Sequence, residues 1–228
     1  MAIDVDAVVF DAVGTLLLVE PPAGEVYYEV GKRHGSKLPR AEVVRRFAEV
    51  FAAEEEHDRV GGLRTSEERE LERWRNIVAH VLDDVADPAA CFEEMFRHFA
   101  LPGAWRVPAG AACLLAKLDR LGYRLALASN FDSRLRSVVA GLPELAVLDR
   151  LVISSEIGWR KPAPEFFAEL SRLLATPACR ILLVGDDPVN DFEGAVRAGL
   201  QALLLDPAGG NGPGRLAHLD DLPGRLAR

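Results

Sequence analysis

The alternation of short apolar runs with amphipathic stretches from residue 105 onward constrains the fold most. Apolar, branched runs predict strands at five places: 5–10, 123–129, 151–154, 180–186 and 201–206. Helical patterns are predicted between the later strands, over 111–122, 133–142, 164–175 and 190–199. Strands that are apolar on both faces and alternate with helices predict a doubly wound parallel sheet, a Rossmann-like α/β core.

The stretch between the first strand and residue 105 has a different pattern. Its periodicity predicts four helices, over 25–35, 41–57, 65–85 and 89–100, without a clear strand signal. Thr65 with Glu68 fits a capping box for the third helix, and Ser66 is the other candidate cap. We therefore predict a core of residues 1–17 and 105–228 and an all-helical cap of residues 18–104. Linkers containing proline, near 17–23 and 101–108, are candidate hinges between the two.

Composition narrows the choice of partners. The net charge is −8 and the arginines alternate with glutamates, so no basic patch for nucleic acid or anionic lipid is expected. No apolar run approaches the roughly 18 residues that span a bilayer, and the acidic N-terminus does not resemble a signal peptide. The three widely spaced cysteines predict reduced, mostly buried thiols in a cytoplasmic protein. The sequence leaves the oligomeric state open.

Polar residues follow four of the predicted strands or their loops. Asp11 ends the first apolar run, Ser129 ends the second, and Lys161 lies in the loop after 151–154. Asp186 follows 180–185, and Asp191 comes shortly after it. Each residue has a plain structural alternative as a turn, cap or surface residue. Because parallel strands end at one edge of a sheet, the four positions together predict a single site.

These residue types suit phosphoryl transfer. A carboxylate at a strand end can act as a nucleophile, and clustered carboxylates favour Mg²⁺. The metal ion and a lysine would supply the positive charge that an anionic substrate needs in an acidic protein. We therefore expect Mg²⁺ as cofactor and a small, phosphorylated substrate.

Four ordered motifs resemble the haloacid dehalogenase superfamily. They are FDAVGTL (10–16), LASN (127–130), GWRKPAPEFF (158–167) and VGDDPVNDFEGA (184–195). The resemblance implies an α-helical cap and a covalent nucleophile, Asp11. It implies that Thr15, Ser129 and the backbone N–H of Asn130 hold the transferring group, while Lys161 stabilises it. The implied metal ligands are Asp11, the carbonyl of Val13, Asp186 and Asp191. Asp191 would bind the metal directly or through water, or would instead orient Lys161.

Val13 departs from the superfamily pattern. Phosphatases of the superfamily usually carry a second aspartate at this position, which protonates the leaving group and then activates water. Valine does neither, and general acid–base catalysis contributes about 10²–10⁴ in rate. We therefore expect a phosphatase restricted to good leaving groups, such as acyl or aryl phosphates.

Two alternatives stay open. One is a metal-independent 2-haloacid dehalogenase. The first motif of this chain also resembles that of such dehalogenases, which have a non-acidic residue at this position because halide leaves without a proton. The acidic fourth motif argues against a dehalogenase. The other is a weakly active protein that binds phosphate or Mg²⁺. Tyr27, Tyr28, Arg45 and Arg46 are candidates for substrate selection, and the alternative for each is a solvated helix surface. Trp159 is expected either to pack beneath the cap or to belong to the core.

Overall fold

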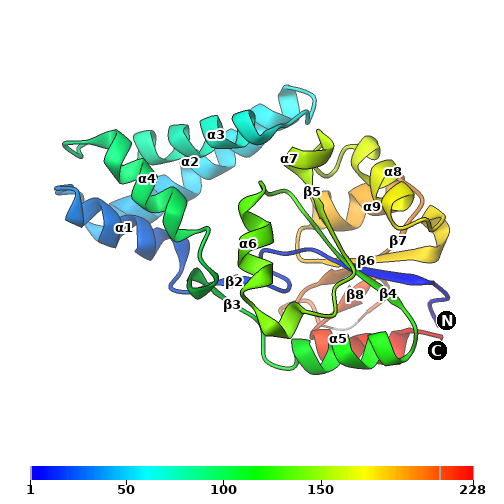
Figure 1. The fold of residues 1–228 in the computed structure, drawn as a ribbon. Helices are drawn as coiled ribbons and strands as arrows, with labels where there is room; N and C mark the ends of the chain where they lie inside the picture. The colour runs from blue at the N-terminus through cyan, green and yellow to red at the C-terminus, as the bar shows by residue number, and fades with distance from the viewer. Residues whose placement is uncertain (1, 211, 228) are drawn as a thin grey trace.

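The computed structural model describes residues 2–210 and 212–227. A six-stranded parallel sheet in the order β5-β4-β1-β6-β7-β8 forms the core (Figure 1). Its strands are β1 (Ala7–Phe10), β4 (Arg124–Ser129), β5 (Arg150–Ile153), β6 (Ile181–Gly185), β7 (Gln201–Leu205) and β8 (Arg215–Leu216). This order confirms the predicted doubly wound parallel sheet. The two-residue strand β8 was not predicted, because it lies beside a glycine-rich loop and is too short for a period-2 pattern.

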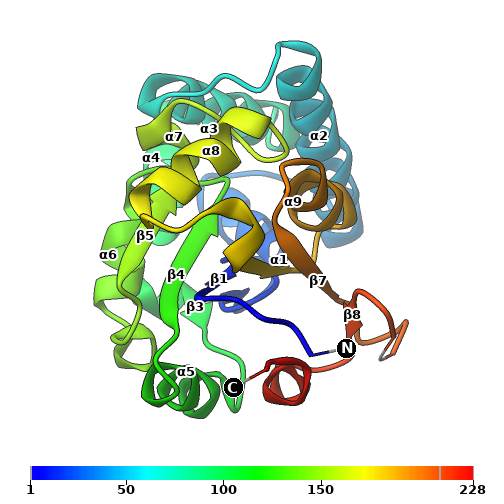
Figure 2. The ribbon, with the colours of Figure 1, turned by 90° about the vertical axis from the view of Figure 1, so that its right-hand side faces the viewer.

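Helices cover both faces of the sheet. They are α5 (Ala111–Arg120), α6 (Arg134–Ala140), α7 (Ser154–Ile157), α8 (Pro164–Leu173) and α9 (Gly194–Arg197). A π-helix, η4 (Pro188–Glu193), precedes α9, and the 3₁₀ segments are η1 (Pro102–Ala104), η2 (Pro143–Leu145), η3 (Ala178–Arg180) and η5 (Leu219–Arg225). The side chains of β1 alternate: Val8 and Phe10 pack in the cluster with α5 and α6, and Val9 packs with α8 and α9. Figure 2 shows α8 and α9 on the opposite side of the sheet from α5.

Four helices form a separate lobe beside the carboxyl ends of the strands (Figure 1). They are α1 (Ala23–Arg33), α2 (Arg40–Val60), α3 (Glu67–Val81) and α4 (Pro88–His98). The amide of Arg69 donates to the hydroxyl of Ser66, so Ser66 is the cap of α3. The Thr65 hydroxyl donates instead to Glu70, which rules out the capping box with Glu68.

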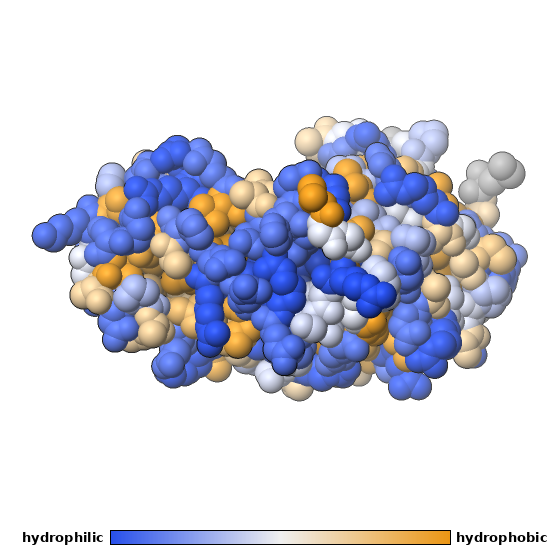
Figure 3. Space-filling model, turned by 90° about the horizontal axis from the view of Figure 1, so that it is seen from above, coloured by the Kyte–Doolittle hydropathy of each residue, from blue (hydrophilic) through white to orange (hydrophobic). Residues whose placement is uncertain are grey.

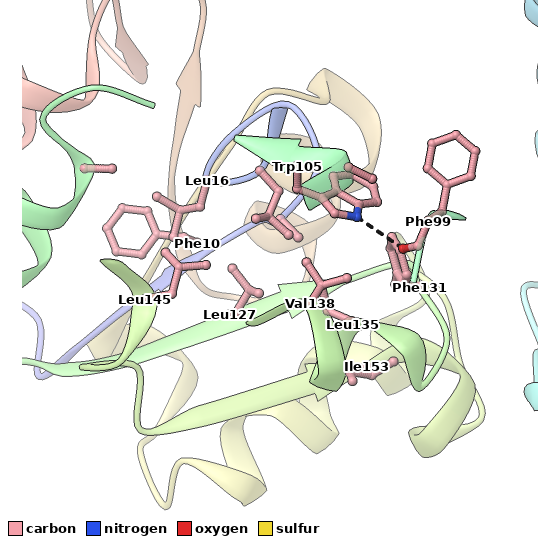
Figure 4. Packing of buried hydrophobic residues seen from close by; sticks show 14 of the residues in the cluster. Phe10, Leu16, Phe99, Trp105, Leu127, Phe131, Leu135, Val138, Leu145 and Ile153 are labelled. Atoms are coloured by element: carbon pink, nitrogen blue, oxygen red, sulfur yellow. Dashed lines mark hydrogen bonds between the residues drawn. The ribbon is translucent and has the colours of Figure 1, made fainter. Parts of the chain in front are cut away.

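The two chain segments that join the lobes pair with each other. Strand β2 (Leu18–Val19) lies antiparallel to β3 (Trp105–Arg106), and the two form a small separate sheet. Figure 4 shows the packing around this junction, where the indole Nε1 of Trp105 donates to the carbonyl of Phe99 at 3.1 Å. The predicted hinge segments therefore form one ribbon between the lobes.

The surface agrees with the acidic, mixed-charge composition. The face in Figure 3 is mainly hydrophilic, with hydrophobic residues scattered over it. Within the described residues, no helix is both long and apolar enough to cross a membrane. The prediction of mostly buried cysteines is wrong: Cys91 is buried, but Cys113 and Cys179 are exposed. Cys113 lies on the solvent side of α5, and Cys179 lies in the turn before β6.

Candidate active site

The loop after β1 presents Asp11 at the edge of the sheet. β1 lies between β4 and β6, so the residues that follow these three strands come together. The carbonyl of Ala12 accepts hydrogen bonds from three successive amides, those of residues 15–17, which makes the turn tight. Gly14 has a φ of +94°, and a Cβ there would lie 2.2 Å from a carboxylate oxygen of Asp186. Glycine is needed here both for its backbone angle and for the space it leaves to Asp186.

Lys161 joins two carboxylates at the centre of the site. Its ammonium donates to an oxygen of Asp11 at 2.6 Å, to Asp191 at 2.6 Å and to the carbonyl of Ala128 at 2.9 Å. The side chain is only 2% exposed. An ammonium has three protons to donate, and these three acceptors use all of them. Lys161 is therefore a fixed, buried charge and not a residue of a surface turn.

Asn130 holds the backbone of Lys161. Its amide nitrogen donates to the Lys161 carbonyl at 2.9 Å, and its amide oxygen accepts from the Lys161 N–H at 2.7 Å. This paired contact ties the end of β4 to the lysine loop and fixes the orientation of the Asn130 side chain. The neighbouring Ser129 is buried against the cavity, and its hydroxyl has no hydrogen-bond partner among the described residues.

The fourth motif supplies carboxylates with different tasks. Asp186 accepts a 3.0 Å hydrogen bond from the Thr15 hydroxyl, so Thr15 contacts this carboxylate directly. Asp191 is buried, and it accepts from the Asp187 amide at 3.1 Å as well as from Lys161. Asp187 caps η4 by accepting from the amides of the next turn, which makes it a structural residue.

The donor set fits Mg²⁺. Asp11, Asp186 and Asp191 each offer an oxygen, and the three oxygens lie within 4.8 Å of one another. Oxygen ligands of an octahedral Mg²⁺ lie about 2 Å from the metal, which places neighbouring ligands about 3 Å apart and opposite ones about 4 Å apart. A hard cation would draw the three acidic oxygens together to these distances. The space left by Gly14 admits the carboxylate of Asp186 to the group.

The charges of the site are unbalanced. Three carboxylates face one ammonium. Burial raises the pKa of Asp11 to about 7, against the attraction of Lys161, and the nearby Asp191 adds to the rise. The pKa of Asp186 is also raised, first by desolvation, although its side chain remains exposed. Without further positive charge, this cluster would repel a phosphate group.

The predicted site residues other than Thr15, which is fully buried and not part of the walls, line one cavity of about 260 Å³ between the lobes. Asp11, Ser129, Asn130 and Lys161 lie on its walls, together with Val13, and Asp186 and Asp191 complete the set from the fourth motif. Val13 is 39% exposed. Position 13 thus presents an apolar side chain to the cavity.

The cap contributes charged residues that sequence reasoning missed. Arg160 is buried and pairs with Glu70 on α3 and, at 2.8 Å, with Glu55 on α2. Arg73 pairs with Glu55 and Asp58. Only the position of Arg160, directly before Lys161, could have singled it out. The network fastens the cap to the lysine loop.

The four cap residues predicted to select the substrate differ in whether they face a cavity. Arg45 pairs with Glu42 and Glu49, and Arg46 pairs with Glu42 and Asp83, so both lie on the outer helix surface. Lys32 lies near the ring of Tyr28, 5.9 Å from its centroid. Tyr27 alone of the four faces a cavity between the lobes.

Trp159 contacts the cap. The guanidinium of Arg64 lies over its ring, 4.4 Å from the centroid, and the two residues form an isolated bridge. Trp159 also packs against the core cluster of α8 and α9, so it serves both predicted roles.

Solved structures and curated proteins resemble the chain over nearly its whole length. YfnB from Bacillus subtilis, in a crystal form bound to magnesium, matches with a TM-score of 0.77 and 19% identity, covering 98% of this chain and 99% of that one. A ribulose-1,5-bisphosphate 5-phosphatase from Halopiger xanaduensis is 28% identical over 89% of this chain and 85% of its own.

Two further findings identify the family. The haloacid dehalogenase-like hydrolase domain-containing protein 3 of Mus musculus is 30% identical over 86% of this chain and 80% of its own. The family model for haloacid dehalogenase-like hydrolases matches residues 5–199. With the six-stranded parallel sheet, these matches confirm the resemblance seen in the four motifs. The chain belongs to the haloacid dehalogenase-like hydrolases.

Proposed function

We propose that the protein is a Mg²⁺-dependent phosphatase that acts on small phosphorylated molecules with good leaving groups. The observation that carries the proposal is the meeting of Asp11, Asp186 and Asp191 around Lys161, beside an apolar residue at position 13. Asp11, Asp186 and Asp191 would hold Mg²⁺, with the carbonyl of Val13 as the fourth proposed ligand. The metal ion would offset the repulsion between the carboxylates and an anionic phosphate.

Asp11 is the nucleophile in this proposal. Lys161 holds one of its oxygens at 2.6 Å, and among the described residues no hydrogen bond reaches the other. That second oxygen attacks phosphorus, the bond to the leaving oxygen breaks, and the electron pair stays on the leaving group. Water then attacks phosphorus, the bond to Asp11 breaks, and the proton of the water passes to solvent.

The remaining residues place the phosphate. The Ser129 hydroxyl and the backbone N–H of Asn130 lie at the end of β4 and donate to phosphate oxygens in this proposal, while Lys161 adds charge. Thr15 acts through Asp186, whose orientation it holds by a 3.0 Å hydrogen bond.

Val13 restricts the substrate. No side-chain acid stands at this position to protonate the departing oxygen, so that oxygen must be stable as an anion. Carboxylates and phenolates meet this condition, whereas alkoxides do not. The Halopiger relative is itself named as a phosphatase, which supports phosphate hydrolysis as the reaction class; its named substrate is an alkyl phosphate, so the restriction to stable leaving groups rests on Val13 alone.

A 2-haloacid dehalogenase is the second candidate, and Val13 is the observation that favours it. Halide leaves without a proton, so an apolar residue at this position costs such a reaction nothing. The three carboxylates weigh against it, because they would repel the carboxylate of a haloacid in the absence of a metal ion.

The test measures hydrolysis of acetyl phosphate and p-nitrophenyl phosphate with Mg²⁺ or EDTA, by the wild type and by Asp11→Asn. Mg²⁺-dependent turnover that the variant loses supports the proposal. Halide release from 2-chloropropionate in EDTA would replace it with the dehalogenase. Absence of all three activities, with Mg²⁺ still bound in a calorimeter, would leave a phosphate- or Mg²⁺-binding protein.

A further inference from the structure

A second cavity, of about 250 Å³, adjoins the one that holds Asp11. Four aromatic rings from cap helices line it, those of Tyr27, Phe47, Phe51 and Trp74. The rings form a chain, with centroids 4.7 Å apart for Tyr27 and Phe47, 5.8 Å for Phe47 and Phe51, and 6.2 Å for Phe51 and Trp74. We call this cavity, with these four rings and those of the next paragraph, the aromatic chamber.

The opposite side of the chamber comes from the junction and the core. Phe99, Trp105 and Phe131 lie there, with ring centroids 6.1 Å apart for Phe99 and Trp105 and 5.7 Å for Trp105 and Phe131. Figure 4 shows these three rings grouped beside the β3 ribbon. The hydrogen bond from the indole Nε1 of Trp105 to the Phe99 carbonyl satisfies the polar atom of that ring.

The chamber opens onto the catalytic cavity. Val13, Phe51, Trp74 and Asn130 line both cavities. A molecule with its phosphate beside Asp11 would therefore reach past Val13 into the chamber with the rest of its structure. The leaving group is the part of a substrate that lies there.

The charged side chain in the chamber wall is already satisfied. Arg134 donates to both oxygens of Asp132, at 2.8 and 2.6 Å, and its guanidinium lies 3.6 Å from the ring centroid of Phe96. Both amide atoms of Asn130 are bound to the backbone of Lys161. A substrate rich in hydroxyls would lose its hydrogen bonds to water in this chamber and find few replacements.

Tyr27 adds a polar atom to the wall. Tyr27 is 1% exposed, and within the described residues its hydroxyl has no hydrogen-bond partner. A hydrogen-bond acceptor on the far side of a bound ring would satisfy this donor.

We infer that the chamber binds the aromatic leaving group of an aryl phosphate, an inference that rests on the proposed phosphatase function. An apolar cavity of about 150 Å³ holds benzene, so about 250 Å³ admits a substituted or fused ring. The leaving-group chemistry also favours an aryl phosphate. A phenolate can leave without a general acid, and Val13 supplies none. Stacking on the surrounding rings orients the leaving group.

The test compares 2-naphthyl, phenyl and acetyl phosphate. The two phenols are of similar acidity, so a difference between their esters reports on apolar binding and not on leaving-group chemistry. We expect kcat/KM to be roughly tenfold higher for the naphthyl than for the phenyl ester, because the second ring is buried. Acetyl phosphate has no ring and measures the reaction without the chamber.

One substitution fills the chamber. Ala23 is partly exposed and lines the chamber from the first turn of α1, so Ala23→Phe occupies the space of a substrate ring. It should lower kcat/KM for the naphthyl ester about tenfold more than for acetyl phosphate. Ala41→Phe is the matched control, because Ala41 is exposed in the first turn of α2 and should change neither value. Circular dichroism checks that both variants fold.

The outcomes separate the two proposals. Turnover of acetyl phosphate without any preference for the naphthyl ester would overturn the inference and leave the proposed function standing. Absence of turnover on all three esters would overturn the proposed function. In that case, quenching of tryptophan fluorescence by 2-naphthyl phosphate decides the inference. Saturable quenching that Ala23→Phe removes would support the chamber as an aromatic site, and no quenching would overturn it.

Discussion

Replacing Val13 by aspartate should convert the site to one that accepts alkyl phosphates. Val13 is 39% exposed and faces the catalytic cavity, so a carboxyl placed there is not forced into the core. Asp11 and Asp186 line the same cavity, and like charges raise the pKa of a carboxyl, which suits a proton donor. A placed general acid contributes about 10²–10⁴ in rate. Even the lower limit lowers the activation free energy by about 3 kcal/mol.

The assay measures kcat/KM on glycerol 2-phosphate and on acetyl phosphate in saturating Mg²⁺. We expect Val13→Asp to raise the value about 100-fold on the alkyl ester and much less on acetyl phosphate, which needs no acid. Val13→Asn is the matched control, because it has nearly the same shape as aspartate and cannot donate a carboxyl proton. A folded Val13→Asp protein with no gain on the alkyl ester would show that the missing acid does not limit the site.

Three further predictions concern the charges of the site. Lys161→Met leaves the buried carboxylates of Asp11 and Asp191 without their cation, so urea unfolding should show a loss of about 3–5 kcal/mol at pH 8; a loss under 1 kcal/mol would contradict the buried pairing. Since burial raises the pKa of Asp11 to about 7, protons compete with Mg²⁺ below that pH. Calorimetry should show an affinity about fivefold lower at pH 6 than at pH 7, because about half of Asp11 is ionised at pH 7 and about a tenth at pH 6. Equal affinities would count against metal binding by Asp11. Arg160→Met breaks the buried contacts between the lysine loop and the cap and should cost about 3 kcal/mol in the free energy of unfolding, whereas the exposed control Arg172→Met should cost less than about 0.5 kcal/mol. Equal losses would argue against the fastening role.

The sequence carried enough information to place residues at the edge of the sheet. Asp11 and Ser129 end β1 and β4, and Asp186 follows β6 directly; these three strands are neighbours in the sheet. A strand can be predicted from its own residues, and this also predicts which residue lies at its carboxyl end. The convergence could therefore be predicted without knowing the packing.

The contacts and cavity of the cap could not be predicted in the same way. Phe47 and Trp74 fit apolar stripes of their helices, and a stripe indicates burial without saying whether it meets another helix or a cavity. The pairing of Arg160 with Glu70 depends on how the cap lies on the core, which the periodicity of neither segment encodes. The exposure of Cys113, by contrast, could have been predicted, because the buried residues of α5 form a helical stripe that excludes it; they are Ala111, Leu114, Leu115 and Leu118.

Asp11 carries the phosphate during turnover in the proposed mechanism, and chemical trapping can detect this covalent intermediate. The protein is mixed with acetyl phosphate and Mg²⁺, reduced with borohydride and digested, and the peptides are examined by mass spectrometry. An aspartyl phosphate is reduced to homoserine, so we expect homoserine at position 11 and unchanged aspartates at positions 186 and 191. Phosphate release with an unmodified Asp11, or with the label on another carboxylate, would contradict it.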